Sequence, residues 1–461
     1  MSTNNAIPVI AIFDVGKTNK KLFLFDENYR IVYEKSARFI ETVDEDGDVC
    51  ENLESLSSSI FDSLREVLKL NEFNIKAINI STYGASFVHI DENGIPITPL
   101  YNYLKEFPEA LKEQFYNTYG GEAKLAKETS SPVLGNLNSG MQLYRIKYQK
   151  PEVFKQIKYS LHLPQYLSYL LTGKPYTDIT SIGCHTGLWD FAKNDYHNWV
   201  YKEGLAEKFA PIISSDTVLP NAEDGDYVIG VGLHDSSAAL IPYLVNFNDP
   251  FILISTGTWC ISLNPFNNQP VTDEELANDC LCYMQYKGLP VKASRLFAGN
   301  EHEIQVKKIA EHFETNTSVF KNIAYDSAII GKLKQAQAAL QPVSRYESAF
   351  VLRPLSSFAN YTEAYHQLMA DIIAQQYEST NMVLEGTNVR RIFVDGGFGK
   401  NAIYMNLLAK VFPKLEIFAA SMAQATAVGA AIAIHSSWNH KPLPADIIEL
   451  KYYSIPHTAT I

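Results

Sequence analysis

A chain of 461 residues is too long for one compact core, so we expect at least two domains. Hydrophobic residues make up 46% of it and charged residues 20%, as in ordinary globular proteins, and a net charge of −12 excludes a broad basic surface for nucleic acid. Five cysteines do not make a disulfide framework, and no apolar run approaches membrane-spanning length. The polar first residues lack the basic region of a signal peptide, so we expect a cytoplasmic location.

The first part of the chain alternates between strand-like and helix-like segments. The apolar run at 9–13 predicts a buried strand, and 21–25 and 31–33 continue it as an antiparallel meander. Residues 52–70 have the apolar spacing of an amphipathic helix, and 77–81 predicts the next strand. This alternation favours an α/β architecture built in layers.

The region from about 101 to 223 is less regular than the segments before it. Helices are expected at 106–119, 139–149 and 164–171, and glycine and proline interrupt them. We interpret this region as an elaboration of the first domain that lines a ligand site.

After Pro242 the opening pattern starts again. A strand at 251–255, a turn and a return strand at 259–263 mirror the first hairpin, which predicts two similar halves, 1–243 and 244–461. The stretch 295–301 fits an exposed helix start and a cleft lining equally well. No clear period is present from Asn439 onward. The remaining elements expected in this half are helices at 294–313 and 362–384, a strand at 391–394, and helices at 402–411 and 423–435.

Three glycine-containing loops each follow a predicted strand, where closely approaching backbone N–H groups can bind phosphate. The first, 14–19, contains Gly16-Lys17-Thr18, but it lacks the earlier glycine and the following helix of a P-loop. The second loop is 255–258, and the third, 395–399, precedes a helix whose N-terminus favours anions. Each loop alone is also explained by a tight turn or a helix cap. Three of them on corresponding strand ends favour a phosphate site.

Asp235 follows a predicted strand at 228–231 and precedes a small-residue helix that we expect to begin near Ala238. Two roles fit an Asp in this place. Its carboxylate can cap the helix N-terminus, which is the commoner role, or it can act as a general base at the floor of a cleft.

Together these segments resemble the FGGY family of carbohydrate kinases, which belongs to the actin-like ATPase superfamily. The resemblance runs from about Val9 to His435 and is nearest to the rhamnulokinase and fuculokinase branch. It implies an α/β fold of two actin-like, ribonuclease H-like domains with an interdomain cleft, with sugar on the first domain and ATP on the second. The residues that carry it are Phe13-Asp14-Val15-Gly16 with Thr18, Tyr83-Gly84, the stretch 163–173, Gly232-Leu233-His234-Asp235, Ser255-Thr256-Gly257-Thr258 and Asp395-Gly396-Gly397.

The resemblance implies transfer of the γ-phosphate of ATP to a sugar hydroxyl, with Asp235 as the base that deprotonates that hydroxyl. Asp14 would lie near Mg²⁺ and hold it through water. The nucleotide-side residues implied are Asp14, Gly16, Thr18, Asn19, Thr256, Gly257, Thr258, Gly396, Gly397 and Asn401. The sugar-side candidates are Tyr83, Gly84, Asn102, Gln165, His185 and His234.

Departures from the family pattern lie on the sugar side. Gln165 stands where the family usually has Asp, His185 stands among small hydroxyl residues, and an Arg-Asp pair is missing near Asn102. The expected substrate is a ketopentose or a 6-deoxyketohexose such as L-rhamnulose or L-fuculose. A polyol or another hydroxylated metabolite, and a non-catalytic actin-like nucleotide-binding protein, remain as alternatives. We expect a small-molecule partner and neither nucleic acid nor membrane, while a homodimer is allowed.

Overall fold

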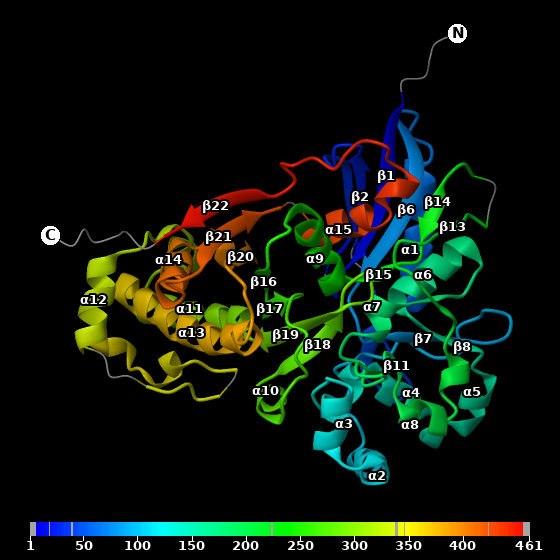
Figure 1. Ribbon diagram of the computed structural model, residues 1–461, viewed down its shortest axis with the longest axis horizontal. Helices are drawn as coiled ribbons and strands as arrows, with labels where there is room; N and C mark the ends of the chain where they lie inside the picture. Colours follow the sequence, from blue (N-terminus) through cyan, green and yellow to red (C-terminus); the bar gives the residue numbers. More distant parts are fainter. Residues whose placement is uncertain are drawn as a thin grey trace. The chain divides into compact units, whose positions relative to one another are not determined.

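The computed structural model describes residues 6–17, 19–37, 40–222, 225–336, 340–344, 346–422 and 424–454. The chain forms two compact units, each built on a mixed β-sheet (Figure 1). The single boundary expected at 243/244 differs from this division, because two later segments return to the first unit. The first unit contains Met1–Asn246, Cys282–Pro290 and Ala423–Ile447, and the second contains Phe247–Leu281, Val291–Met422 and Ile448–Ile461.

The sheet of the first unit has the order β13-β14-β6-β1-β2-β3, with β15 also pairing to β6. The first three strands form the expected antiparallel meander, and β6 runs parallel to β1, β14 and β15. Parallel strands covered on both faces are expected to be continuously apolar, which explains the run in β1. The strands are β1 (Ile7–Val15), β2 (Lys20–Asp26), β3 (Ile31–Ala37), β6 (Phe73–Thr82), β13 (Val218–Pro220), β14 (Val228–Gly230) and β15 (Leu233–His234).

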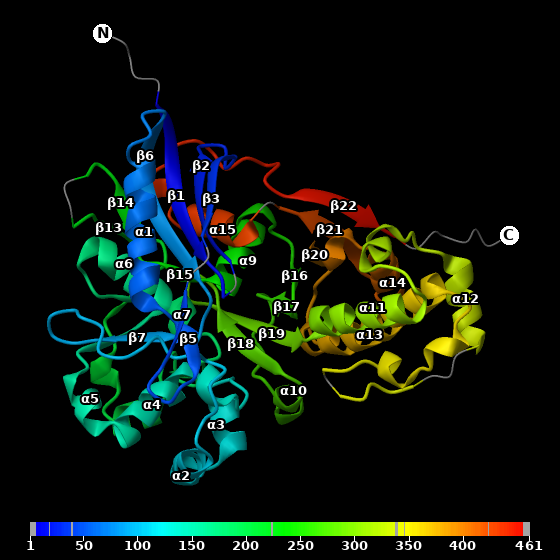
Figure 2. The ribbon, with the colours of Figure 1, turned by 180° about the vertical axis from the view of Figure 1, so that it is seen from behind.

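Helices cover both faces of this sheet. Helix α1 (Leu53–Val67) is capped by Asn52, whose side chain accepts the N–H of Ser55 at 2.9 Å. The apolar face of α1 shares a core with alternate residues of β1. Figure 2 shows α1 beside the strands of this sheet. Helices α9 (Asp235–Asn246) and α15 (Ala425–Ala433) pack on each other, and α15 also contacts β1 and β6 (Figure 1).

The region expected to elaborate the first unit has a second hydrophobic core of its own, centred on aromatic residues such as Phe115, Tyr144 and Trp199. Its helices are α2 (Glu109–Tyr119), α3 (Glu122–Glu128), α4 (Ser139–Gln149), α5 (Pro151–Gln156), α6 (Leu163–Thr172), α7 (Ile179–Ile182) and α8 (Asn198–Lys202). Short strand pairs accompany the first unit: β4 (Glu41–Val43) with β5 (Val49–Glu51), β7 (Phe87–Ile90) with β8 (Tyr159–His162), β9 (Thr177–Asp178) with β12 (Ile212–Ile213), and β10 (Trp189–Asp190) with β11 (Asp195–Tyr196).

The sheet of the second unit has the order β18-β19-β17-β16-β20-β21-β22. Its centre repeats the arrangement of the first sheet, because β16 is antiparallel to β17 and parallel to β20. The strands are β16 (Phe251–Thr256), β17 (Cys260–Asn264), β18 (Cys280–Met284), β19 (Pro290–Leu296), β20 (Arg391–Gly396), β21 (Glu416–Ser421) and β22 (Glu449–Tyr453). The helices are α10 (Asp273–Ala277), α11 (Ala298–His312), α12 (Ser327–Ala336), α13 (Tyr361–Leu384) and α14 (Ala402–Val411).

Two sequence-based expectations about elements were wrong. The helix expected at 294–313 begins only at Ala298, because Ser294 pairs with Ser262 of β17 and the sheet extends to Leu296. Helix α9 begins at Asp235 and not near Ala238. The tail, for which the sequence gave no clear period, contains β22, whose side chains are mostly exposed. All five cysteines are free, and no helix of the described residues is both long and apolar enough to cross a membrane.

The contact between α9 and α15 depends on a glycine. A Cβ atom on Gly429 would lie 1.8 Å from the carbonyl oxygen of Ala238, far inside van der Waals contact. Only glycine therefore allows the two helix backbones to approach this closely. Because α9 starts at Asp235, this approach also fixes where that carboxylate lies.

Replacing Gly429 by Ala should destabilise the protein by about 1–3 kcal/mol, as overpacking does elsewhere, because the two helices have to separate. The matched control is Gly331→Ala in α12, where an added Cβ meets nothing within 4 Å. The control should be neutral or stabilising by up to about 1 kcal/mol, since alanine favours helix more than glycine. Differential scanning calorimetry of both variants measures this, and equal melting temperatures for them would contradict the tight contact.

Candidate active site

Asp235 lies at the edge of the first sheet where three strands end. In β15, Leu233 and His234 pair with Ser81 and Thr82 of β6, and α9 begins at the next residue, Asp235. Asp14, near the end of β1, pairs with the same Ser81 from the other side. The sheet register therefore brings the two carboxylates to one edge, on either side of β6.

The Asp235 carboxylate takes part in the helix start and stays accessible. Its Oδ1 atom accepts the backbone N–H of Ser236 at 2.6 Å and the Ser236 hydroxyl at 3.2 Å. The side chain is still 35% exposed, so it can reach a ligand. The carboxylate therefore bonds to its neighbour Ser236 in the helix and stays accessible to solvent.

His234 is the neutral partner of Asp235. Its Nε2 atom lies 3.3 Å from Oδ1 of Asp235, and burial lowers the pKa of the imidazole more than the nearby carboxylate raises it. Its Nδ1 atom is buried and has no hydrogen-bond partner among the described residues. The ring lies 5.6 Å from that of Tyr283 and 6.2 Å from that of His185, centroid to centroid. His185 and His234, both expected on the sugar side, are therefore neighbours of Asp235.

Two other sugar-side candidates position this segment of the chain. Gln165 is buried, and its Nε2 atom donates to the carbonyl of Gly232 at 2.9 Å, while Oε1 has no partner among the described residues. Gly232 needs glycine, because its φ is +87° and a Cβ would lie 2.7 Å from the carbonyl oxygen of Pro164. A Cβ on Gly84 would lie 2.9 Å from the His234 ring. Gly84 therefore makes room for that imidazole.

The pKa of the Asp14 carboxyl is far above its ordinary value. Burial, and after it the negative charge of Asp235, raise the pKa of its carboxyl to about 7, although Lys21 acts in the opposite direction. The hydroxyl of Ser81 between the two carboxylates is also buried without a hydrogen-bond partner among the described residues. A hard cation such as Mg²⁺ prefers oxygen ligands and would offset this negative charge, so the residues present fit Mg²⁺ held by Asp14.

The first glycine loop joins β1 to β2. The N–H of Gly16 donates to the carbonyl of Asn19 at 2.9 Å, which closes a tight turn. Asn19 is exposed at the end of this turn. Thr18, expected near the γ-phosphate, lies outside the described residues.

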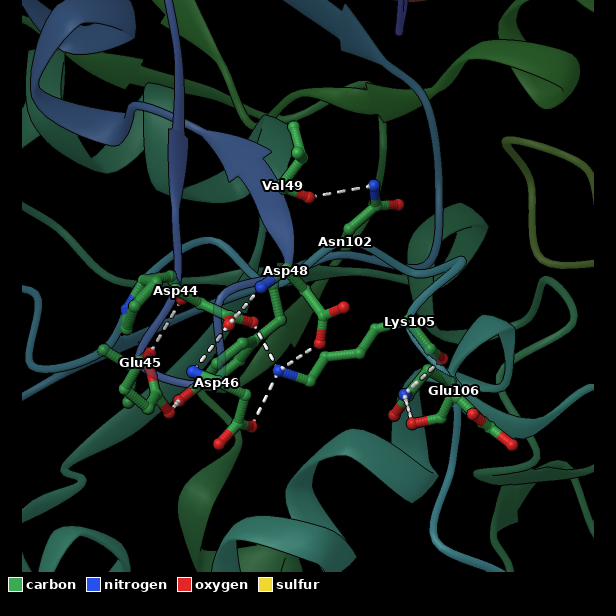
Figure 3. A network of polar contacts seen from close by, with 12 residues as sticks. Asp44, Glu45, Asp46, Asp48, Val49, Asn102, Lys105 and Glu106 are labelled. Atoms are coloured by element: carbon green, nitrogen blue, oxygen red, sulfur yellow. Dashed lines mark hydrogen bonds and ion pairs between the residues drawn. The ribbon is translucent and has the colours of Figure 1, made fainter.

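The side chains of Tyr83 and Asn102 both form hydrogen bonds to the β4–β5 hairpin. The Tyr83 hydroxyl donates to the buried Glu51 carboxylate at 2.8 Å. Figure 3 shows the Asn102 amide directed at Val49, whose carbonyl accepts its Nδ2 at 3.1 Å. Lys105 fixes the hairpin turn, because its ammonium lies 2.5–2.8 Å from carboxylate oxygens of Asp44, Asp46 and Asp48 (Figure 3).

The second unit contains a pocket of about 930 Å³, large enough for a nucleotide. Four residues predicted on the nucleotide side line it: Thr256, Gly257, Gly397 and Asn401. Gly299, from the stretch 295–301 whose role the sequence left open, lines it too.

The backbones of the glycine loops that form this pocket lie very close to one another. A Cβ on Gly396, whose φ is +90°, would lie 2.0 Å from the carbonyl oxygen of Thr256, and a Cβ on Gly299 would lie 1.8 Å from that of Gly257. The N–H of Gly397 donates to the Thr256 carbonyl at 3.2 Å. The carbonyl of Thr258 accepts the N–H of Asn300 at 3.2 Å. Gly396 and Thr258 therefore shape the loops that form the pocket.

A chain of hydrogen bonds runs along one wall of the pocket. Asn401 caps α14, its Nδ2 atom donates to the Tyr365 hydroxyl at 2.7 Å, and that hydroxyl lies 3.0 Å from Nε2 of His302. Burial lowers the pKa of His302 to about 4, so this imidazole is neutral at physiological pH. A short 3₁₀ turn, Phe398–Lys400, precedes α14, which covers the residues 402–411 expected for this helix.

Sequence reasoning missed several residues that the fold brings to these sites. No motif marked Glu51, Tyr103 or Tyr283. In the structure Glu51 and Tyr103 lie next to Tyr83, and Tyr283 lies next to His185 and His234. In the second unit the pocket is also lined by His302, Lys307, Phe320, Lys321, Tyr365 and Phe398, which come from α11, the segment after it, α13 and the 3₁₀ turn. Helical spacing identified Tyr365 only as part of a predicted helix face.

Replacing Asp14 by Asn should stabilise the metal-free protein at pH 8 more than at pH 5. A raised carboxyl pKa means that the folded state binds the proton more tightly than the unfolded chain, so stability falls as pH rises from about 4 to about 7. Asn removes that cost, which is about 1.4 kcal/mol for each unit of pKa shift. Thermal melting in a chelator at pH 5 to 8 measures it.

Asp62→Asn on the exposed face of α1 is the control and should leave the pH profile of the melting temperature unchanged. Added Mg²⁺ should raise the melting temperature of the wild type at pH 8 and not that of Asp14→Asn. A melting temperature of Asp14→Asn that rises with Mg²⁺ as much as the wild type's would contradict the assignment of the cation to Asp14.

Comparison with known proteins identifies the family. Residues 9–227 match the FGGY family of carbohydrate kinases, N-terminal domain, and residues 248–442 match carbohydrate kinase FGGY, C-terminal domain. A rhamnulokinase of Mannheimia succiniciproducens is 23% identical over 448 residues, which cover 89% of this chain and 86% of that one. A rhamnulokinase of Halalkalibacterium halodurans is 27% identical over 273 residues, 54% of each chain.

Solved structures share the fold. A carbohydrate kinase from Novosphingobium aromaticivorans has a TM-score of 0.79 at 22% identity and covers 97% of this chain and 94% of its own. A xylulose kinase from Lactobacillus acidophilus has a TM-score of 0.75 at 18% identity, with coverages of 97% and 93%. The family resemblance of the sequence is thereby confirmed: the chain belongs to the FGGY family of carbohydrate kinases and is an ATP-dependent sugar kinase with the two-domain actin-like fold.

Proposed function

We propose that this sugar kinase transfers the γ-phosphate of ATP to a hydroxyl of a ketose, with Asp235 as the general base. The observation that carries the proposal is the partly exposed Asp235 carboxylate beside the neutral His234, at the strand end shared with Asp14. A partly exposed carboxylate can accept the proton of an alcohol that binds next to it.

The proposed reaction needs one proton transfer and one displacement. Asp235 takes the proton of the acceptor hydroxyl, and the acceptor oxygen forms a bond to the γ-phosphorus. The bond from that phosphorus to the β–γ bridging oxygen breaks, and its electron pair leaves with ADP. Mg²⁺, when bound through Asp14, neutralises phosphate charge. His234 keeps Asp235 oriented through its Nε2 contact at 3.3 Å.

The residues around Asp235 suit a small polyhydroxy acceptor. His185, His234 and Tyr283 present aromatic faces and polar edges within one cluster. The relatives named rhamnulokinase favour a 6-deoxyketohexose such as L-rhamnulose, and L-fuculose and ketopentoses are the next candidates. A polyol or another hydroxylated metabolite is the alternative within the same reaction. The non-catalytic actin-like alternative loses its support, because the chain belongs to a carbohydrate kinase family.

The acceptor can be identified with a panel of ketoses, aldoses and polyols in a coupled ADP-release assay. We expect ATP consumption to depend on added sugar and kcat/KM to be highest for a 6-deoxyketohexose or a ketopentose. Hydrolysis of ATP in the absence of sugar should be slow, because the reaction requires an oriented acceptor. Higher kcat/KM for polyols than for every ketose would overturn the ketose assignment.

Asp235→Asn should lower kcat by about 10²- to 10⁴-fold, the usual contribution of a general base, while ATP binding stays within twofold. Single-turnover phosphoryl transfer and calorimetric titration with ATP measure the two quantities. Asp62→Asn serves as the matched control, because it makes the same chemical change on an exposed helix. Near wild-type turnover in Asp235→Asn would assign the base to another residue.

A further inference from the structure

Three lysines lie in the loop between β1 and β2 and at the start of β2, and two of them, Lys17 and Lys20, share Glu51 as a partner. Lys20 is buried, and its Nζ atom lies 3.0 Å from Oε2 of Glu51. Lys21 donates to Glu34 at 2.8 Å. Lys17 lies 3.4 Å from Oε1 of Glu51, the oxygen that already accepts the Tyr83 hydroxyl at 2.8 Å.

Lys17 is the loosely held member of this group. Charge-assisted hydrogen bonds of an ammonium are about 2.7–2.9 Å long, so the 3.4 Å separation from Glu51 is an ion pair without a full hydrogen bond. The side chain is 30% exposed, whereas that of Lys20 is 7% exposed. The ammonium of Lys17 can therefore change partners at little cost.

Two aromatic rings limit where the Lys17 ammonium can go. It lies 5.4 Å from the ring centroid of Tyr83 and 5.4 Å from that of Tyr103, and the two rings are 5.9 Å apart. These distances are within the range of cation–π attraction, which at partly exposed sites is weak. The rings keep the ammonium close to the loop without competing with a phosphate.

Carboxylates act on the groups that lie near this ammonium. The pKa of Asp14 is raised by burial and by the charge of Asp235. The pKa of the Tyr103 phenol is raised by burial, by Asp235 and by Glu51, which places the ring beside Lys17 within the field of the catalytic carboxylate. A triphosphate that approaches Asp235 meets these like charges, and catalysis of phosphoryl transfer depends on cations that offset them.

We propose that Lys17 binds the γ-phosphoryl group of ATP during transfer, leaving Glu51 to do so, and is a catalytic residue of this kinase. The inference rests on the proposed function, because it needs Asp235 to be the site of transfer. Lys17 donates hydrogen bonds from its ammonium to phosphate oxygens and forms no covalent bond. It remains protonated throughout, since the acceptor's proton goes to Asp235. In the unliganded protein the Lys17 ammonium lies next to Glu51, Tyr83 and Tyr103.

Lys17→Met tests the proposal, because it removes the charge and keeps the length of the side chain. We expect it to weaken binding of a non-hydrolysable ATP analogue with Mg²⁺ by about 10- to 100-fold, the range of one charge-assisted hydrogen bond. Binding of ADP, which has no γ-phosphate, should stay within twofold of the wild type. Isothermal titration calorimetry measures both constants, and kcat should fall by at least the same factor as the analogue affinity.

Two further variants separate this role from a structural one. Lys17→Arg keeps the charge and should retain most of the preference for the analogue over ADP. Lys35→Met makes the same change on an exposed lysine of β3, which pairs with Glu66, and should alter neither constant. A misfolded Lys17→Met would be recognised by its melting temperature, in which case Lys17→Gln replaces it.

Several outcomes would overturn the proposal. Equal losses for ADP and the analogue would make Lys17 a structural residue of the loop, and no loss for either would remove it from the site. A rise in the KM of the sugar alone would assign Lys17 to the acceptor. One outcome separates the two proposals. If Asp235→Asn turns over normally while Lys17→Met loses affinity for the analogue and not for ADP, the proposed base is wrong and Lys17 still binds the γ-phosphate.

Discussion

Electrostatic repulsion between two carboxylates is the constraint on which the site of the first unit depends. Asp14 and Asp235 reach the same sheet edge because β1 and β15 both pair with β6. Hydrogen bonds of the sheet prevent either strand from moving away, so the repulsion persists. Burial, and after it this repulsion, raise the pKa of Asp14 to about 7. A cation relieves that repulsion. We propose Mg²⁺ as this cation. In the metal-free protein the raised pKa of Asp14 lowers stability as the pH rises from about 4 to about 7.

In the second unit, close contact between backbone segments determines where the glycine loops lie. Gly396 and Gly299 bring three chain segments together around Thr256 and Gly257, at distances that no side chain would allow. The same device sets α9 against α15 in the first unit, through Gly429. In each case a glycine fixes the position of a loop or of a helix start. Substituting such a glycine should therefore affect activity indirectly, through the position of neighbouring residues.

Polar side chains near Asp235 divide into those that hold the framework and those that remain available to a ligand. Gln165 supports Gly232, and Tyr83 and Asn102 are bonded to the β4–β5 hairpin. Buried polar groups need such partners, because leaving them unpaired costs free energy. His234 and Gln165 each keep one buried polar atom, Nδ1 and Oε1, without a hydrogen-bond partner among the described residues.

The sequence by itself determined the α/β class, the repeated hairpins and the glycine loops at strand ends, because these features are local. Apolar runs mark buried strands, and glycines mark the turns that follow them. Only the tertiary structure decided that 290–296 is a strand, because its pairing with β17 outweighs the local pattern. It also decided that Cys282–Pro290 and Ala423–Ile447 join the first unit, and that Glu51 and Tyr103 lie beside Lys17. Contacts between residues distant in the chain depend on strand register and packing, which no single segment of sequence specifies.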